Sequence, residues 1–257
     1  MTIEFQNKKI HYTDTGKGET LVLLHGFLES KEIWTNFIPE FSKYGRIITI
    51  DLPGHGKSEC IEEVHTMELM AQVVKAVLSE LGVKKANFIG HSMGGYVTLA
   101  FLEANPEMVN ELMLLNSTPE EDSEEKRTNR DRAVEVVQRN KKAFVSMAIS
   151  NLLTPENEKI FSKEVAELKR RASAFPTKGI TAALKGMKIR TNRIETLKKH
   201  SGPKIIVSGA EDSLIDLMTI RSLAKKCETS HIVLPGGHLS YLECRNEFLN
   251  LCISSKK

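Results

Sequence analysis

The sequence is poor in cysteine and has no long apolar run. Its cysteines, Cys60, Cys227, Cys244 and Cys252, are scattered and form no CxxC pair. This spacing argues against a structural metal site and for reduced thiols, as in cytoplasmic proteins. No apolar run approaches the roughly 20 residues that a membrane-spanning helix needs, and the start, MTIEFQNKK, lacks the apolar core of a secretory signal. We therefore expect a cytoplasmic protein with no metal and no membrane partner, in which the glycosylation sequon Asn116-Ser117-Thr118 has no role.

Charge is unevenly distributed along the 257 residues. The net charge is +3, with 27% charged and only 6% aromatic residues. Residues 119–200 hold 19 Lys+Arg and 12 Asp+Glu, a net charge of +7, whereas the rest holds 17 and 21, a net charge of −4. Basic residues that are interleaved with acidic ones and with few aromatics are not typical of a nucleic-acid surface. The contrast predicts two parts with different surfaces and no nucleic-acid partner.

Short apolar runs rich in β-branched residues recur along most of the chain. Several are apolar almost throughout, as expected of strands that are covered on both faces. Helical patterns lie between them, as in Thr66–Leu81, which stops at Gly82, and in Tyr96–Ala104 and Ile215–Lys226. Strands that alternate with helices predict an α/β fold with a doubly wound, mostly parallel sheet. The expected strands are Lys9–Thr13, Thr20–Leu24, Arg46–Ile50, Ala86–Gly90, Glu111–Leu115, Lys204–Ser208 and Ser230–Leu234.

The alternation breaks for about eighty residues in the middle of the chain. This stretch is polar and charged, shows no strand pattern, and predicts three or four amphipathic helices with stops near Pro155, Pro176 and Gly179. A helical insertion between two strands would lie over one end of the sheet as a lid. The expected domains are a core of residues 1–118 and 201–257 and a helical cap of residues 119–200.

Ser92 lies in Gly90-His91-Ser92-Met93-Gly94, which matches the G-x-S-x-G pattern of a nucleophile elbow. A strand that turns directly into a helix strains the turn residue, so the neighbours two positions away must be small. The preceding FIG is strand-like and the following YVTLAFLEA is helix-like, while Gly95 leaves room for close packing. The pattern predicts that Ser92 is a nucleophile and that His91 points away from the substrate. The alternative is a serine in a glycine-rich loop that only packs well.

A serine hydroxyl needs a base, and the base needs an acid that orients it. The strand KIIVSG is followed by Glu211 and Asp212, and the strand in SHIVLPGGH is followed by His238. Both positions lie just past the C-terminal end of a strand, where α/β sheets place their sites, and the order serine, acid, histidine is the expected one. We assign His238 as the base and Asp212 as the acid, with Glu211 and Asp216 as rivals to Asp212.

A tetrahedral oxyanion also needs backbone N–H donors. One is expected from Met93, the residue after the nucleophile. The other should come from the loop after an early strand, where LVLLHGF ends in His25-Gly26-Phe27. The N–H of Phe27 is the natural second donor, because Gly26 lets the backbone come close to a ligand.

Several large apolar residues are candidates for a substrate pocket. Their spacing is also that of helix faces in a core, which is the more frequent role of a buried aromatic. The positive charge of the central insertion is compatible with steering of an anionic substrate, but a solvated helical surface explains it as well. We expect a small-to-medium apolar acyl group. The candidates are Phe27, Leu28 and Trp34 from the core and Phe144, Met147, Phe161 and Phe175 from the cap.

Five segments together resemble the α/β-hydrolase superfamily, in particular serine carboxylesterases and lipases with a helical cap. They are LVLLHGFLES, DLPGHGKS, GHSMGG, SGAEDSLI and PGGHLSYLE, and the resemblance extends over nearly the whole chain. It implies a triad of Ser92, Asp212 and His238, an oxyanion hole of Phe27 and Met93, a helical cap and no cofactor.

The resemblance also narrows the chemistry. Epoxide hydrolases and haloalkane dehalogenases of this fold carry aspartate where this chain has Ser92, and the similar menaquinone-pathway lyase usually has arginine where this chain has Tyr96. Carboxylesterases and small lipases match GHSMGGY best. We therefore expect a serine hydrolase that cleaves a small-molecule carboxylic ester through an acyl-enzyme, as a monomer or homodimer. The alternatives are the lyase, a cofactor-free haloperoxidase and a ligand receptor with slow turnover.

Overall fold

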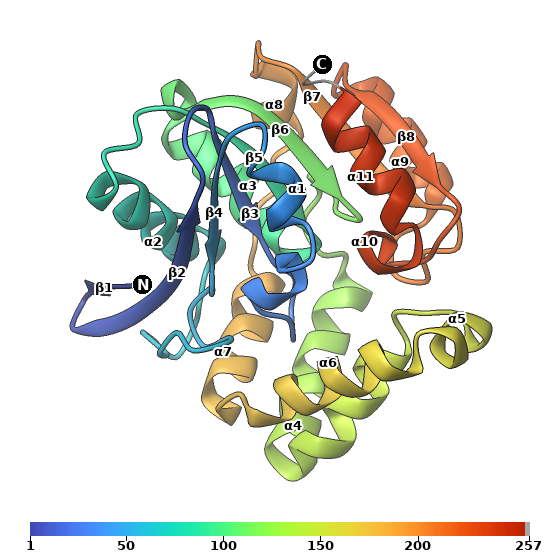
Figure 1. The fold of residues 1–257 in the computed structure, drawn as a ribbon. Coiled ribbons are helices and arrows are strands. Elements are labelled where there is room, and N and C mark those ends of the chain that lie inside the picture. The colour runs from blue at the N-terminus through green and yellow to red at the C-terminus, as the bar shows by residue number, and fades with distance from the viewer. Residues whose placement is uncertain (255–257) are drawn as a thin grey trace.

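An eight-stranded sheet, in the order β1-β2-β4-β3-β5-β6-β7-β8, forms the centre of the computed structural model, which describes residues 1–254 (Figure 1). Neighbouring strands from β4 to β8 are parallel, and the pairs β1–β2 and β2–β4 are antiparallel. The predicted α/β class with a mostly parallel sheet is confirmed. The strands are β1 (Thr2–Phe5), β2 (Lys8–Thr15), β3 (Thr20–Leu24), β4 (Arg46–Ile50), β5 (Ala86–His91), β6 (Val109–Leu115), β7 (Lys204–Gly209) and β8 (Ser230–Leu234).

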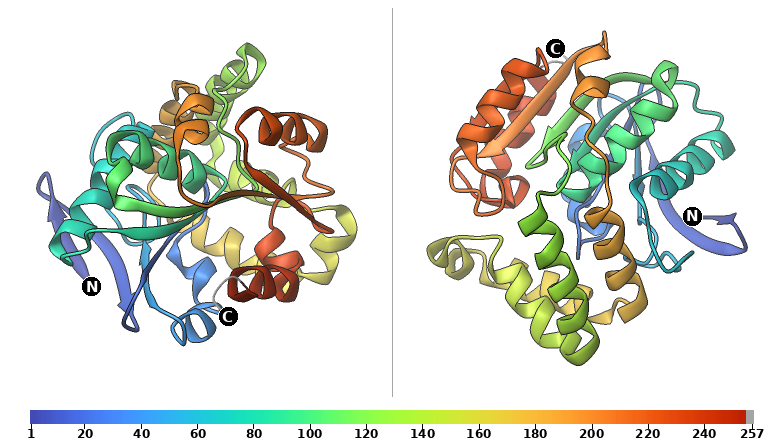
Figure 2. Two further views of the ribbon diagram at one scale, coloured as in Figure 1. Left: turned by 90° about the horizontal axis from the view of Figure 1, so that it is seen from above. Right: turned by 180° about the vertical axis from the view of Figure 1, so that it is seen from behind.

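Helices cover both faces of this sheet. Figure 2 shows α2, α3, α8 and α9 over one face and α1, α10 and α11 over the other. The two short 3-10 helices are η1 (Lys31–Trp34) and η2 (Pro106–Met108). The α-helices are α1 (Ile38–Phe41), α2 (Met67–Glu80), α3 (Met93–Ala104), α4 (Glu124–Ser150), α5 (Pro155–Ile160), α6 (Ser162–Ala174), α7 (Thr177–Lys188), α8 (Ile194–Lys199), α9 (Leu217–Lys226), α10 (Ser240–Glu243) and α11 (Arg245–Ser254).

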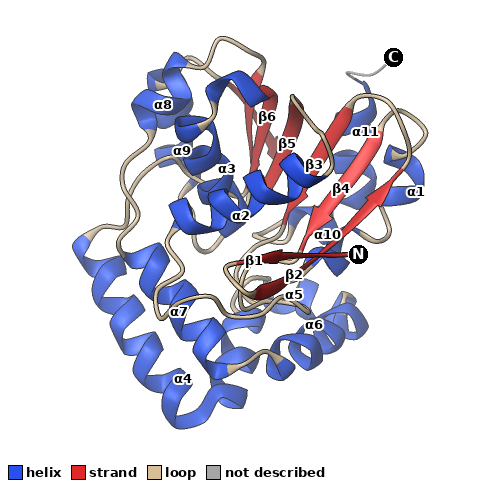
Figure 3. Ribbon diagram, turned by 90° about the vertical axis from the view of Figure 1, so that its left-hand side faces the viewer, coloured by secondary structure: helices blue, strands red, loops and turns tan. Residues whose placement is uncertain are grey.

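The strands form where apolar runs are covered on both sides. Every residue of β5 is buried, and β3 and β4 are buried almost throughout, as expected of central parallel strands. All the strands expected from the sequence are present. The structure adds β1 at the edge of the sheet, where Figure 3 shows it beside β2. It has four residues and none is fully buried, so its short sequence carries no continuous apolar run.

Helix α2 shows how local sequence sets the ends of an element. The hydroxyl of Thr66 caps its start by accepting a hydrogen bond from the N–H of Leu69 at 3.0 Å. Its apolar stripe faces the core, and Met67, Met70, Val73, Val74, Val77 and Leu78 are all buried. After it, Gly82 has a φ of +65°, a left-handed conformation that ends helices and favours glycine.

Helices α4 to α8 occupy the central insertion. Figure 1 shows α4–α7 beyond the end of the sheet toward which the parallel strands point, whereas α8 packs against α3 and α9. The limits of the predicted cap domain stay a prediction. The expected stops near Pro155 and Pro176 coincide with the start of α5 and the N-cap of α7, but the stop at Gly179 is wrong. Helix α7 starts at Thr177 and runs through Gly179, where the absence of a Cβ lets the helix pack closely against the backbone of Gly54.

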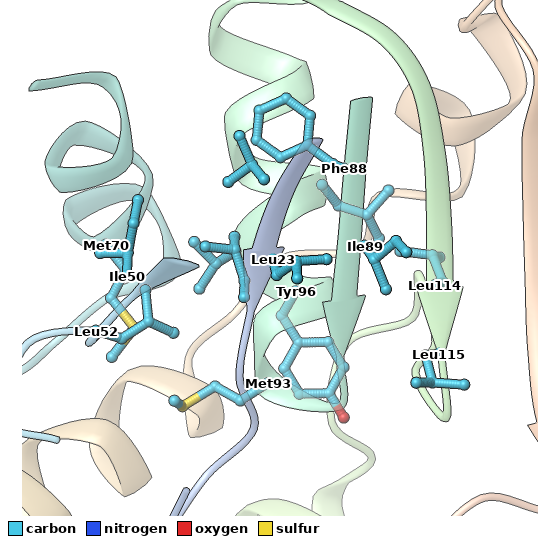
Figure 4. Packing of buried hydrophobic residues seen from close by; sticks show 14 of the residues in the cluster. Leu23, Ile50, Leu52, Met70, Phe88, Ile89, Met93, Tyr96, Leu114 and Leu115 are labelled. Carbon is cyan, nitrogen blue, oxygen red and sulfur yellow. The ribbon is translucent and has the colours of Figure 1, made fainter. Parts of the chain in front are cut away.

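The core lies between the sheet and the helices on its faces. Figure 4 shows side chains from β3–β6 meeting those of α2 and α3, and this burial of apolar surface is the main stabilising contribution. Within residues 1–254, no helix is both long and apolar enough to cross a membrane. The labelled residues of this packing are Leu23, Ile50, Leu52, Met70, Phe88, Ile89, Met93, Tyr96, Leu114 and Leu115.

Candidate active site

Ser92 lies on a sharp turn between β5 and α3. Its φ of 49° and ψ of −115° are unusual for a residue with a side chain. Neighbouring segments pack so closely that a Cβ at Gly90 would lie 2.5 Å from the oxygen of Gly94, and a Cβ at Gly94 would lie 2.5 Å from the oxygen of Leu24. The small residues of the G-x-S-x-G pattern are therefore a steric requirement of the turn that raises Ser92 above the sheet.

The structure brings Ser92, His238 and Asp212 together in one chain of hydrogen bonds. Nε2 of His238 lies 2.9 Å from Oγ of Ser92, and Nδ1 of His238 lies 2.8 Å from Oδ2 of Asp212. The carboxylate of Asp212 can only accept, so Nδ1 carries the proton and Nε2 is free to accept one from Ser92. This is the arrangement that a general base requires.

Asp212 is held in place by several donors. Its Oδ2 accepts a hydrogen bond from Nδ2 of Asn116 at 2.9 Å, and its Oδ1 accepts from the N–H groups of Leu214 and Ile215. Burial raises the pKa of Asp212, but the charge and hydrogen bond of His238 and the hydrogen bond from Asn116 outweigh it, so the pKa lies below its ordinary value. The carboxyl group therefore stays ionised beside His238.

The rival acids have other surroundings. Asp216 is the N-cap of α9, where its Oδ2 accepts a hydrogen bond from the N–H of Thr219 at 2.7 Å. Glu211 is exposed, and its backbone N–H donates to the oxygen of Gly236. Among the expected acids, only Asp212 contacts His238.

Two further residues contact the site, Asn116 and Ser117, and the sequence does not predict them as site residues. Both follow β6, and Asn116 adopts a φ of 47°. Asn116 donates to Asp212 and to the oxygen of Gly237, and the hydroxyl of Ser117 donates to the oxygen of Ser92 at 2.8 Å. Their match to a glycosylation sequon says nothing about a site. The signal that could have found them is their position after β6, because β6 lies between the two strands that precede Ser92 and Asp212.

The expected oxyanion donors come from two elements. Met93 is the first residue of α3, so its N–H has no acceptor within the helix. The N–H of Phe27 has no hydrogen-bond acceptor among residues 1–254. Phe27 lies in the loop after β3, whose backbone is fixed because the N–H of Gly26 donates to Oε2 of Glu29 at 2.6 Å. Both N–H groups are thus available, and their role as an oxyanion hole is a proposal.

A buried polar network lies behind His238. Nδ1 of His91 lies 2.8 Å from Oε2 of Glu29, and Nε2 of His91 lies 2.9 Å from the backbone oxygen of His238. The hydroxyl of Tyr241 donates to Oε1 of Glu29 at 2.9 Å. His91 is 1% and Glu29 3% exposed. The network therefore links the Gly26 loop to the segment that carries His238.

The partners of His91 identify its charge state. A backbone oxygen and a carboxylate both accept only, so both ring nitrogens of His91 donate and the ring is an imidazolium. Burial lowers the pKa of His91, but the charge and hydrogen bond of Glu29 outweigh it and raise the pKa above its ordinary value. Burial raises the pKa of Glu29, but the charge and hydrogen bond of His91 and the N–H of Gly26 bring it below its ordinary value. The two form a buried ion pair.

Replacing Glu29 with glutamine should lower the free energy of unfolding, because it breaks this ion pair. The amide is nearly isosteric: its oxygen can face Gly26 and His91, and its NH₂ group can face the oxygen of Tyr241. The carboxylate charge is lost, the hydroxyl of Tyr241 has to change from donor to acceptor, and breaking a buried pair costs about 3 kcal/mol of unfolding free energy. Urea unfolding of both proteins at pH 5.5 and pH 9 measures the difference.

The pH dependence of that difference has a definite sign. The raised pKa of His91 contributes stability below its ordinary value of 6.5, and this is lost as pH rises through the higher folded value. The lowered pKa of Glu29 contributes above 4.5 and is lost as pH falls through the lower folded value. The cost of Glu29→Gln should therefore be largest between 4.5 and 6.5. Glu40→Gln, in a surface pair with Lys43, serves as control; an equal effect of both variants would contradict the buried pair.

A cavity of about 530 Å³ adjoins Ser92 and His238. Of the candidate pocket residues, Phe27, Leu28, Phe144 and Met147 line it, together with Tyr96 and Leu152. Its volume is typical of a small-molecule site. Most of its exposed lining is apolar, with charged side chains at the start of α4, so it suits an uncharged chain with room for polar groups at one side.

Three of the expected pocket residues lie elsewhere. Trp34 is fully buried, because it packs against Phe37, Tyr241 and Phe248 in an aromatic cluster beneath α10 and α11.

Phe161, between α5 and α6, packs on the apolar core, and Phe175 contacts the ring of His55 and lines a second cavity beside α6. Their apolar character serves packing between the cap helices and the core, which spacing alone does not distinguish from a pocket. Across residues 1–254, no group of three or more His, Cys, Asp or Glu side chains is arranged to hold a metal.

Known proteins share this architecture. The family model described as the alpha/beta hydrolase fold matches residues 19–243. A thermophilic esterase from Thermogutta terrifontis, with malate bound, has a TM-score of 0.93 at 26% identity and covers 99% of this chain and 97% of its own. The enol-lactonase from Burkholderia xenovorans LB400 has a TM-score of 0.91 at 19% identity, with 99% and 98% covered, and is similar in fold.

A curated relative is more similar over a shorter stretch. The 2-hydroxy-6-oxononadienedioate/2-hydroxy-6-oxononatrienedioate hydrolase of Paraburkholderia phymatum is 43% identical over 113 residues. The match covers 42% of this chain and 39% of that protein, so it spans about two fifths of the relative's length.

Proposed function

Because the chain belongs to the alpha/beta hydrolase fold family, we propose that it is a serine hydrolase that cleaves carboxylic esters of small-to-medium apolar acyl groups. The observation that carries the proposal is the hydrogen-bond chain from Oγ of Ser92 through His238 to Asp212. The similarity to the Thermogutta terrifontis esterase, at 26% identity over 99% of this chain, supports ester hydrolysis.

The reaction follows from the positions of these groups. Nε2 of His238 takes the proton of Ser92 as Oγ attacks the ester carbonyl. The N–H groups of Phe27 and Met93 stabilise the oxyanion, and His238 returns the proton to the departing alcohol, which leaves an acyl-enzyme. Water, deprotonated by His238, then attacks the acyl carbon, and the acid leaves as Ser92 is restored. Asp212 orients the ring and stabilises its charged form.

A series of p-nitrophenyl esters tests this proposal. We expect steady turnover with every short and medium acyl chain and a fall in kcat/KM for the longest chains, because the cavity holds about 530 Å³. A single stoichiometric release of nitrophenol without turnover would identify a ligand receptor. Absence of any release would contradict ester hydrolysis and leave the lyase or haloperoxidase chemistry for direct assay.

A second candidate rests on the curated relative. A hydrolase of 2-hydroxy-6-oxononadienedioate is 43% identical to this chain over 113 residues, which favours a substrate of that class. The same protein preparation should be offered that compound alongside the esters. A higher kcat/KM for it than for the best nitrophenyl ester would favour this second candidate.

A further inference from the structure

Most of the charged side chains around the cavity are balanced by a charge of the opposite sign. Glu29 is paired with His91 in the buried network. Glu125 and Lys126 both line the cavity, both are exposed, and their charges cancel. Asp122 and Arg130 also line it, and together with Arg190 they form a third charged cluster.

Asp122 is shared by two arginines. Nε of Arg130 donates to Oδ2 of Asp122 at 3.1 Å, and Nη1 of Arg190 lies 2.5 Å from Oδ1, an ion pair by distance although it lacks hydrogen-bond geometry. Arg190 is fixed in turn, because its Nε donates to the oxygen of Glu120 at 3.0 Å and its guanidinium lies 4.1 Å from the centre of the Tyr96 ring. One carboxylate faces two guanidinium groups, so this cluster has an unbalanced positive charge.

Arg130 is the member of the cluster that is accessible to a ligand in the cavity. Its side chain is 24% exposed, against 2% for Arg190 and none for Asp122. The bond from Nε orients the guanidinium, while Nη1 and Nη2 have no hydrogen-bond acceptor among residues 1–254. A guanidinium with two free terminal nitrogens matches the geometry of a carboxylate.

We propose that the substrate carries one carboxylate, that Arg130 binds it in the cavity, and that the ester carbonyl meets Ser92 at the other side. This inference rests on the proposed ester hydrolysis and adds a terminal carboxylate to the apolar acyl chain. The single unbalanced charge points to a monoanion, and the apolar walls of the cavity fit an aliphatic chain between the two groups. The substrate class is therefore the half-esters of aliphatic dicarboxylic acids.

The test compares substrates that differ only in this charge. The monoethyl esters of succinic, adipic and suberic acid are each compared with the analogue in which the free carboxylate is a primary amide. Released ethanol is measured at pH 7.5. For at least one chain length, the wild-type protein should prefer the acid over the amide by about 10- to 100-fold in kcat/KM, because a hydrogen bond to a charged group discriminates to that extent. Equal kcat/KM values at every chain length would overturn the inference.

Variants assign the preference to Arg130. Arg130→Gln should reduce the acid-to-amide ratio by about 10- to 100-fold, and Arg130→Lys should retain part of it, because lysine keeps the charge without the planar fork. Arg132→Gln is the matched control: Arg132 lies on the same helix, is exposed, and donates to Oδ1 of Asn129. An unchanged ratio in Arg130→Gln, or an equal loss in Arg132→Gln, would contradict the role of Arg130.

The two proposals fail in different ways. Hydrolysis of the amide-bearing esters that Ser92→Ala abolishes supports the serine hydrolase whatever the ratio shows. If no ester of either series is hydrolysed, the proposed function fails and the inference fails with it. If both are hydrolysed through Ser92 without a preference that depends on Arg130, the inference alone fails.

Discussion

Replacing Ser92 with alanine should lower the turnover of p-nitrophenyl butyrate by about 10⁴- to 10⁶-fold. The substitution removes the oxygen that attacks the ester in the proposed mechanism, and His238 loses the group that lies 2.9 Å from its Nε2. The turn itself should persist, because alanine has a smaller side chain at the same backbone position and the close contacts around it involve Gly90 and Gly94. Steady-state kinetics, with the folded state checked by circular dichroism, measure the loss.

The control for this variant is another serine. Ser79 lies in the last turn of α2 and is exposed, so Ser79→Ala should leave kcat within about twofold. A Ser92→Ala protein whose kcat stays within tenfold of the wild type would contradict nucleophilic catalysis by Ser92.

Replacing Asp212 with asparagine should lower kcat by about 10⁴-fold, the loss known for this change in other triads. Both oxygens of Asp212 accept hydrogen bonds, from His238, Asn116, Leu214 and Ile215. An amide NH₂ group cannot accept a hydrogen bond, so the single oxygen of asparagine can satisfy only some of these donors, and the others lose their acceptor. Nδ1 of His238 then loses its acceptor, and the tautomer that can take the proton of Ser92 is no longer favoured.

Asp216 provides the matched control for this variant. Asp216→Asn changes the same residue type four positions away, but it alters only the exposed N-cap of α9, where asparagine is nearly as good as aspartate. Its kcat should stay close to that of the wild type. If Asp216→Asn lost activity as strongly as Asp212→Asn, the acid of the triad would be misassigned.

The pKa of Asp212 adds a dependence on pH. Because the folded value lies below the ordinary 3.8, this carboxylate contributes stability above pH 3.8 and loses it as pH falls through the lower folded value. The carboxylate is therefore ionised throughout the range in which esters are assayed.

The central strands are predictable from the sequence because burial on both faces leaves a continuous apolar run. The expected bounds of β3, β4 and β8 coincide with the observed ones. The edge strand β1 lacks this signal, since its burial alternates between exposed and half-buried positions. The predicted stop at Gly179 is wrong for a related reason: a glycine in a helical pattern marks either a stop or a close approach, and only the contact with Gly54 distinguishes the two.

The candidate site is predictable where its residues follow strands, and less so where they depend on neighbours in space. The positions of Ser92, Asp212 and His238 after the ends of strands predict that they meet, and the structure brings them within hydrogen-bond distance. The contact of Asn116 with Asp212 exists because β6 and β7 are adjacent in the sheet, which no local pattern states. Trp34 has the same apolar character as a pocket residue, and only its aromatic partners place it in the core.

The most direct test of the central claim is to locate a stable covalent adduct after reaction with a p-nitrophenyl dialkylcarbamate. Such a carbamate acylates a serine hydrolase as an ester does, but the carbamoyl-enzyme hydrolyses slowly, so the product accumulates. We predict one equivalent of nitrophenol and, by peptide mass spectrometry, one carbamoyl group on Ser92 in Gly90–Gly94. A protein that hydrolyses esters while Ser92 stays unmodified, or that carries the carbamoyl group on another residue, would contradict the account.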